Sequence, residues 1–324
     1  MMSRKPKILV VGSFVMDLIA STTRFPQSGE SIIGFDFSTA PGGKGANQAV
    51  QAAYLGADVS MVGKVGNDDF GKILRESIGA SGVDCSRVAV SQTRPSAVGN
   101  IQLEVTESGT ANRILVVPGA NMDITPSDVA FLENDIKEYD MVILQLEIPM
   151  EINELVAEYA HKNGVAVMLN SAPSAPLSDK LLSCLTYISP NEHEASDLTG
   201  IKITDDETAQ KAVKALREKG VKNVLITMGS RGAAFYDGEE FFISESVDYG
   251  PVLDPTAAGD SFVGAFCTAT CAGAAPKDAL LFANHTAAIT VAGMGAQPSL
   301  PKLSKVLEFM NKNGFNTEKY EILK

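Results

Sequence analysis

The sequence predicts an α/β protein with a central, mostly parallel sheet flanked by helices and a small second β-sheet. Two observations carry this prediction. Short apolar runs alternate with helix-periodic segments between residues 7 and 227, and the loops between them are short. The chain is almost entirely helical in character after residue 257. Since no internal repeat or low-complexity linker interrupts it, we expect residues 1–324 to form a single domain.

The expected elements follow in chain order. Strands are predicted where apolar runs end at glycine or polar residues, the pattern of a sheet buried on both faces, at residues 7–13, 59–65, 141–146, 165–169, 186–188 and 223–227. Helices are predicted where apolar residues recur at helical spacing, at residues 42–56, 69–80, 152–162 and 207–219. Asn163-Gly164 and Gly220 provide helix ends.

Two segments, residues 18–39 and 97–117, break this alternation. They are extended and punctuated by turns, and they lack helical periodicity. We expect them to be insertions that pair into a small antiparallel sheet and form a lid over a pocket. Apolar residues alternate in part along the first insertion, so its two faces could cover a ligand or meet a second subunit: Ile32, Ile33, Phe35 and Phe37.

Composition excludes several classes of protein. With 27 Lys+Arg against 39 Asp+Glu, the net charge of −12 argues against a protein that coats nucleic acid, although a nucleotide ligand stays possible. No segment approaches the roughly 20 apolar residues of a membrane span. The 4 cysteines and 3 histidines form no metal-binding or disulfide spacing. A cytoplasmic enzyme is therefore expected.

The first motif is the glycine-rich segment from Gly42 to Asn47. Its glycines let the backbone approach a small polar ligand, and the helix that follows offers free N–H groups. The amide of Asn47 can both donate and accept, which suits sugar hydroxyls. A glycine-rich turn with an Asn cap is an equal alternative for this segment alone.

The second motif runs from Asp254 to Asp260. The small residues at 257–259 open a helix, so their N–H groups can converge on an anion. Asp260 would repel a phosphate there unless it accepts the proton of a hydroxyl that attacks that phosphate. The alternative is that Asp260 only complements the helix dipole.

Residues 42–66 and 254–266 together resemble the two signatures of the PfkB carbohydrate kinase family. Shorter segments are similar to the ribokinases of that family, in the same order along the chain: residues 145–147, 190–194, 227–232 and 295–299. The resemblance extends from the first strand to about Pro301. It implies a ribokinase-like fold and an ATP-dependent kinase that phosphorylates the 5-hydroxyl of D-ribose.

The resemblance also implies roles for individual residues. Asp260 would be the general base, and the N–H groups around Ala257, Ala258 and Gly259 would form an anion hole. Sugar-binding positions would be Val15, Asp17, Gly43, Lys44, Gly45, Ala46, Asn47 and Glu147. Nucleotide-binding positions would be Asn191, Thr227, Gly229, Ser230, Gly232, Gly259 and Asn284.

Cations and a partner subunit follow from the same resemblance. Glu194, in the N-x-x-E element that begins at Asn191, would organise Mg²⁺ through water. A K⁺ ion would be bound by the side chain of Asp254 and mostly by backbone oxygens of Thr256, Thr290, Gly293, Gly295 and Ser299. Family members often dimerise through their lid sheets, so a homodimer is expected, with no nucleic acid or membrane partner.

One position departs from the family pattern. Ribokinases typically begin G-S-x-N-x-D, whereas Val15 stands at the Asn position here. Loss of that amide removes a hydrogen bond worth about 0.5–1.5 kcal/mol, which makes 2-deoxyribose a competitor to ribose. A nucleoside kinase and a non-catalytic sugar-binding protein are further alternatives, and the intact Asp260 counts against the latter.

Overall fold

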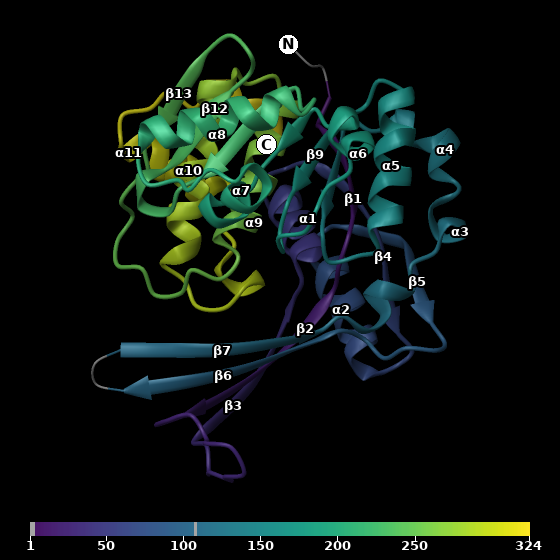
Figure 1. Ribbon diagram of the computed structural model, residues 1–324, viewed down its shortest axis with the longest axis vertical. Coiled ribbons are helices and arrows are strands. Elements are labelled where there is room, and N and C mark those ends of the chain that lie inside the picture. Colours follow the sequence, from purple (N-terminus) through teal and green to yellow (C-terminus); the bar gives the residue numbers. More distant parts are fainter. Residues whose placement is uncertain (1–3, 107–108) are drawn as a thin grey trace.

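The computed structural model describes residues 4–106 and 109–324, so residues 107–108 of the second predicted insertion lie outside it. A large sheet with helices on both sides forms the body, and a smaller sheet projects from one end of it (Figure 1). The predicted architecture is confirmed.

The large sheet has nine strands in the order β13-β12-β11-β10-β9-β8-β1-β4-β5. Every pairing from β5 to β11 is parallel, whereas β12 pairs antiparallel with both β11 and β13, so β12 is the strand that runs in the reverse direction. Three of these strands, β5, β12 and β13, were not predicted. The bounds are β1 Lys7–Val11, β4 Asp58–Gly66, β5 Asp84–Ser91, β8 Met141–Gln145, β9 Ala166–Asn170, β10 Tyr187–Ile188, β11 Asn223–Thr227, β12 Ala233–Tyr236 and β13 Phe241–Ser244.

Helices cover both faces of this sheet. One face is covered by α1 Lys44–Tyr54, α2 Asp69–Ala80, α9 Ala258–Cys271, α10 Pro276–Val291 and α11 Leu303–Lys312. The other is covered by α3 Pro126–Val129, α4 Leu132–Asp135, α5 Met150–Lys162, α6 Asp179–Cys184, α7 Glu192–Thr199 and α8 Asp206–Glu218. Within the described ranges, no helix combines the length and the apolar character needed to cross a membrane.

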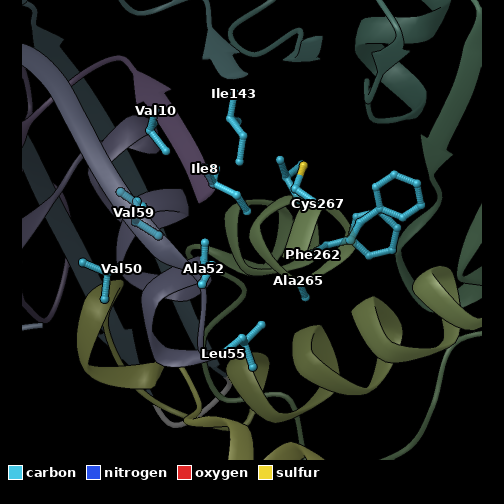
Figure 2. Close-up of a cluster of buried hydrophobic side chains, with 14 of the residues drawn as sticks. Ile8, Val10, Val50, Ala52, Leu55, Val59, Ile143, Phe262, Ala265 and Cys267 are labelled. Carbon is cyan, nitrogen blue, oxygen red and sulfur yellow. The ribbon is translucent and has the colours of Figure 1, made fainter. Parts of the chain in front are cut away.

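Strand β1 shows why the sequence of a central strand is a continuous run of apolar residues. Ile8 and Val10 point into the core beneath α1 and α9, and Figure 2 shows Ile8 directed toward the helix that carries Phe262 and Cys267. Leu9 and Val11 point into the core on the opposite face. Because both faces are covered, neither set of alternating side chains can be polar.

The smaller sheet has the order β3-β2-β6-β7, with bounds β2 Val15–Thr22, β3 Asp36–Gly42, β6 Val98–Thr106 and β7 Gly109–Val117. The hairpins β2–β3 and β6–β7 are antiparallel, as predicted. The two hairpins are joined by a parallel pairing of β2 with β6, which the prediction lacked. Strand β2 follows β1 along the chain, and β6 follows β5. Because β1 and β5 run in the same direction, β2 and β6 leave the large sheet at the same end and lie parallel to each other.

Candidate active site

Polar residues gather where the parallel strands of the body end. In an open α/β sheet, side chains beyond the carboxyl ends of neighbouring strands meet at one edge. Here they lie at the last residue of β1, β8, β9, β10 or β11 or shortly beyond it, and they are Ser13, Gln145, Glu147, Asn170, Ser189, Asn191 and Thr227. The N-termini of α1 and α9 reach the same edge, because Asn47 of α1 contacts Asp260 of α9.

The glycine-rich loop before α1 packs closely on the end of β1. A Cβ on Gly45 would lie 2.5 Å from the Ser13 nitrogen, and Gly43 has a φ of 97°, so neither position accepts a larger residue. The N–H of Lys44 donates to Glu147 Oε2 at 3.1 Å, and that of Gly45 donates to Ser13 Oγ at 3.2 Å. These N–H groups, which we expected to be free for a ligand, instead fix Glu147.

Asp260 lies in the first turn of α9 and is only 7% exposed. Its Oδ2 accepts a hydrogen bond from Asn47 Nδ2 at 2.9 Å, and its Oδ1 accepts one from Gln48 Nε2 at 3.0 Å. The carboxylate is therefore held from both sides by α1. A role limited to the helix dipole does not account for these bonds.

The turn that precedes Asp260 has unusual backbone geometry. Ala257, the N-cap of α9, has a φ of 61°, a left-handed conformation that costs a non-glycine residue about 1 kcal/mol or more. The Ala258 N–H donates to the Pro255 carbonyl at 3.2 Å. The N–H groups of Ala257, Gly259 and Asp260 have no partner in the described part of the chain, so they stay available for an anion.

Asp17 lies within β2, at the base of the lid, rather than in a turn. Glycines on both neighbouring strands make room for the Asp17 carboxylate. A Cβ added to Gly42 would lie 3.0 Å from Asp17 Oδ2, and a Cβ added to Gly99 would lie 2.4 Å from Asp17 Oδ1. Burial, with a further contribution from the Glu147 carboxylate, raises the pKa of Asp17 to about 6. The Val15 side chain faces the same glycine, with Cγ1 3.6 Å from a Cβ at Gly99.

Lys44 lies among acidic groups from three parts of the chain. Burial by itself would lower the pKa of its ammonium, but the carboxylates of Asp260, Glu147 and Glu194 outweigh burial and raise it above the ordinary value. Lys44 therefore stays charged, and it links the Asp260 side of the site to α7.

Asn191 and Glu194 form a capping box at the start of α7. Glu194 accepts from the Asn191 N–H at 2.8 Å and from Asn191 Nδ2 at 2.9 Å, and Asn191 Oδ1 accepts from the Glu194 N–H. Burial raises the pKa of Glu194 despite the bond from Asn191 and the nearby Lys44. Among the described residues, no group of three or more His, Cys, Asp or Glu could hold a metal directly. A contact between Glu194 and a metal through water fits this arrangement.

The predicted nucleotide positions lie around the end of β11. Thr227 forms a bridge with Asn191, and the turn after it closes against the end of β13, since a Cβ on Gly232 would lie 2.0 Å from the Ser244 carbonyl oxygen. Asn284 Nδ2 donates to that same carbonyl at 3.0 Å. Gly229 and Ser230 belong to this turn, so all the predicted nucleotide positions except Gly259 lie near these strand ends.

The predicted K⁺ positions are also brought together. Asp254 Oδ1 accepts from the Thr256 N–H and Oδ2 accepts from the Gly295 N–H, both at 2.9 Å, so one carboxylate joins two loops. A Cβ on Gly293 would lie 2.8 Å from Ser299 Cβ and 3.4 Å from the Thr290 carbonyl oxygen. Four backbone carbonyls here accept no hydrogen bond within the described ranges, namely those of Thr256, Gly293, Gly295 and Ser299. Unpaired carbonyl oxygens are suitable ligands for a hard cation.

Five polar residues of the site were not predicted to have a role: Ser13, Gln48, Gln145, Asn170 and Ser189. Ser13 Oγ donates to Glu147. Gln48, Gln145 and Asn170 form a chain of amides behind Asp260, and the Ser189 carbonyl accepts from Asn170. Their position after apolar strands, or next to Asn47 in α1, was the signal in the sequence that could have found them.

Comparisons with known proteins identify the family of the chain and several relatives. The family model described as pfkB family carbohydrate kinase matches residues 5–303. The ribokinase of Haemophilus influenzae is 38% identical over 304 residues, which is 94% of this chain and 98% of that protein. The deoxyribokinase of Salmonella typhi is 34% identical over 313 residues, 94% of this chain and 99% of that protein. The structure of Arabidopsis thaliana ribokinase complexed with ribose and ATP superimposes with a TM-score of 0.87 at 34% identity, covering 94% of this chain and 99% of that one.

Proposed function

Because the chain belongs to the pfkB family of carbohydrate kinases and is an ATP-dependent sugar kinase of the ribokinase type, we propose that it phosphorylates the 5-hydroxyl of D-ribose. The observation that carries this proposal is the Asp260 carboxylate, which two amides hold beside the free N–H groups at the start of α9. The Arabidopsis relative, whose structure contains ribose and ATP, supports the choice of substrates.

In the proposed reaction, the sugar O5 attacks the γ-phosphorus of ATP while its proton passes to Asp260. The bond between O5 and phosphorus forms as the bond to the β,γ-bridging oxygen breaks, and ADP leaves. The N–H groups of Ala257 and Gly259 stabilise the negative charge on the transferred phosphoryl group. The Ala258 N–H contributes only if it gives up its long bond to Pro255.

The sugar binds between the lid and the body. Asp17 offers a carboxylate with no hydrogen-bond donor in the described chain, and Glu147, fixed by Ser13 and Lys44, offers a second. Paired carboxylates suit the hydroxyls of a polyol. The remaining loop from Gly43 to Asn47 surrounds the reacting end, because Asn47 contacts Asp260.

Two cations complete the proposal. Glu194 would hold Mg²⁺ through water beside the phosphates, where the ion neutralises phosphate charge. Asp254 and the unpaired carbonyls of Thr256, Gly293, Gly295 and Ser299, together with Thr290, would hold K⁺. This chain's own part is to keep those oxygens in place, which the bonds from Asp254 to both loops achieve.

A second substrate, 2-deoxyribose, is favoured by one observation. Val15 is buried at the start of β2 and faces the same glycine as Asp17, so it has no polar group to offer a ring hydroxyl there. A hydrogen in place of that hydroxyl packs well against a methyl group. The similarity to a deoxyribokinase is consistent with this alternative.

We also propose that two copies of the chain pair through the lid in the cytoplasm. The lid is a single layer, and its edge strand β7 exposes four consecutive apolar residues, Ile114, Leu115, Val116 and Val117. Strand β3 exposes Phe37, and Ile33 and Phe35 before it are exposed as well. Pairing covers an apolar edge that would otherwise favour aggregation. The free cysteines suit a reducing compartment.

A coupled assay of ADP release tests the proposed reaction with ribose, 2-deoxyribose and adenosine, with and without K⁺. We expect the highest kcat/KM with ribose and a loss of at least about 10³-fold in kcat in Asp260→Asn. A higher kcat/KM with 2-deoxyribose would assign the alternative substrate. Turnover of adenosine alone would indicate a nucleoside kinase, and no turnover would leave a sugar-binding protein.

A further inference from the structure

Gln48 connects the proposed base to a chain of amides inside the protein. It follows Asn47 in α1, and its side chain reaches Asp260 on α9. We propose that Gln48 is a positioning residue that holds the Asp260 carboxylate in the orientation needed to take the proton from the sugar. This inference rests on the role of Asp260 proposed above.

The direction of each hydrogen bond in the chain is set by a backbone group. The Ser189 carbonyl can only accept, so Asn170 turns its Nδ2 toward it, at 2.9 Å. Asn170 Oδ1 therefore faces Gln48, whose Nε2 donates to it at 3.1 Å and to Asp260 Oδ1 at 3.0 Å. Both hydrogens of Gln48 Nε2 are used, so the amide cannot turn over without losing both bonds.

The far side of Gln48 is fixed as well. Its Oε1 accepts from Gln145 Nε2 at 2.7 Å, and Asn153 in turn donates to the Gln145 backbone carbonyl at 2.9 Å. Gly12 leaves the space for this arrangement, since a Cβ there would lie 1.9 Å from Gln145 Oε1. Gln48 and Gln145 are both 0% exposed. Because both side chains are fully buried, a hydrogen bond lost from this chain of amides is costly, which favours the arrangement described.

The consequence for Asp260 concerns the plane of its carboxylate. Asn47 holds one oxygen and Gln48 holds the other, which together prevent rotation about the Cβ–Cγ bond. Without Gln48, only the bond from Asn47 remains, and the carboxylate can turn away from the attacking hydroxyl. Misplacement of a reacting group by about 1 Å can reduce a rate by about 100-fold.

The chain offers a matched control in Gln51, which is the same residue type on the same helix. It is also 0% exposed, and its Nε2 donates to the Pro301 carbonyl at 2.9 Å. It makes no hydrogen bond to Asp260. Replacing either glutamine by methionine keeps the length of the side chain and removes one buried amide, but only one replacement disturbs Asp260.

The experiment compares Gln48→Met, Gln51→Met, Asp260→Ala and the double variant Gln48→Met/Asp260→Ala, with ribose and ATP. We expect Gln48→Met to lower kcat at least about tenfold, with both KM values within about twofold of wild type. Gln51→Met should lower the Tm but keep kcat within about twofold. In the Asp260→Ala background, Gln48→Met should leave the residual kcat unchanged, because it acts only through Asp260.

The inference is wrong if Gln48→Met lowers kcat no more than Gln51→Met does, or if it lowers kcat equally with and without Asp260. Should Gln48→Met fail to fold, Asn170→Ala replaces it in the same cycle, since it removes an acceptor that orients the Gln48 amide. Wild-type kcat in Asp260→Ala would instead overturn the proposed base. An inactive Asp260→Ala with a fully active Gln48→Met would overturn the positioning role alone.

Discussion

Substituting Val15 by asparagine tests how the site distinguishes ribose from 2-deoxyribose. Val15 is only 5% exposed and shares a face of β2 with Asp17, toward Gly99. Asparagine is smaller than valine, so Val15→Asn adds a donor and an acceptor without overpacking the position. We expect the amide to hydrogen-bond a ring hydroxyl that ribose has and 2-deoxyribose lacks.

The magnitude follows from that single bond. One intramolecular hydrogen bond contributes about 0.5–1.5 kcal/mol, and every 1.4 kcal/mol corresponds to a tenfold change. The ratio of kcat/KM for ribose to kcat/KM for 2-deoxyribose should therefore rise about 2- to 12-fold in Val15→Asn. The rise should come from ribose, because 2-deoxyribose gains no partner and meets a polar group instead of a methyl.

The assay measures initial rates of ADP release with each sugar at saturating ATP, and then with both sugars in competition. Val15→Ala is the control, because it loosens the packing next to Gly99 without adding a donor. It should lower kcat/KM for both sugars alike. An unchanged ratio in Val15→Asn, or an equal change in Val15→Ala, would refute the reasoning.

Three further predictions concern pH, the cation and the lid. Because the pKa of Asp17 is raised to about 6, its carboxylate is ionised above that pH. The value of kcat/KM for the sugar should therefore fall as the pH drops below about 6. Asp17→Asn should lower kcat/KM at neutral pH and abolish this pH dependence. Asp254→Ala should raise the K⁺ concentration for half-maximal activity at least about tenfold by releasing two loops, whereas Asp248→Ala, which removes a turn bond of the same loop, should not. Leu115→Glu places a charge on a side chain that is 66% exposed on the lid and should convert dimer to monomer in sedimentation velocity, whereas Ile73→Glu on α2 should not.

The sequence was sufficient for elements whose pattern is local. The helix predicted at 69–80 has these bounds in α2, since Asp68 caps its first turn by accepting from the Gly71 N–H at 2.8 Å. Strand β5 was missed because it forms one edge of the sheet and the first half of the strand has no buried residue, so it lacks the continuous apolar run of the central strands. Helix α7 has little apolar periodicity, and its main signal was the capping box at Asn191.

The residues of the site can likewise be divided into those found in local motifs and those that depend on long-range packing. The segments from Gly42 to Asn47 and from Asp254 to Asp260 are contiguous, so their chemistry could be inferred from neighbouring residues. The bond between Gln48 and Asp260 joins residues 212 positions apart, and it depends on how α1 packs against α9. Nothing in either local pattern specifies that packing. The partners of Gln48 on the other side depend on the strand order, which brings β8 and β9, with Gln145 and Asn170, next to β1.

The acidic composition bears directly on how the site binds ATP. The net charge of −12 acts at a distance only weakly, because dissolved ions screen exposed charges beyond about 8 Å. The charges at Lys44 are buried or half-buried and therefore screened less, and they comprise one ammonium against the carboxylates of Asp260, Glu147 and Glu194. Lys44 alone therefore cannot balance an incoming triphosphate. In the proposed site, the free N–H groups at the start of α9 would contact phosphate, and the unpaired carbonyls around Asp254 would hold a cation nearby. Activity should therefore depend on cations more steeply than the affinity for the neutral sugar does.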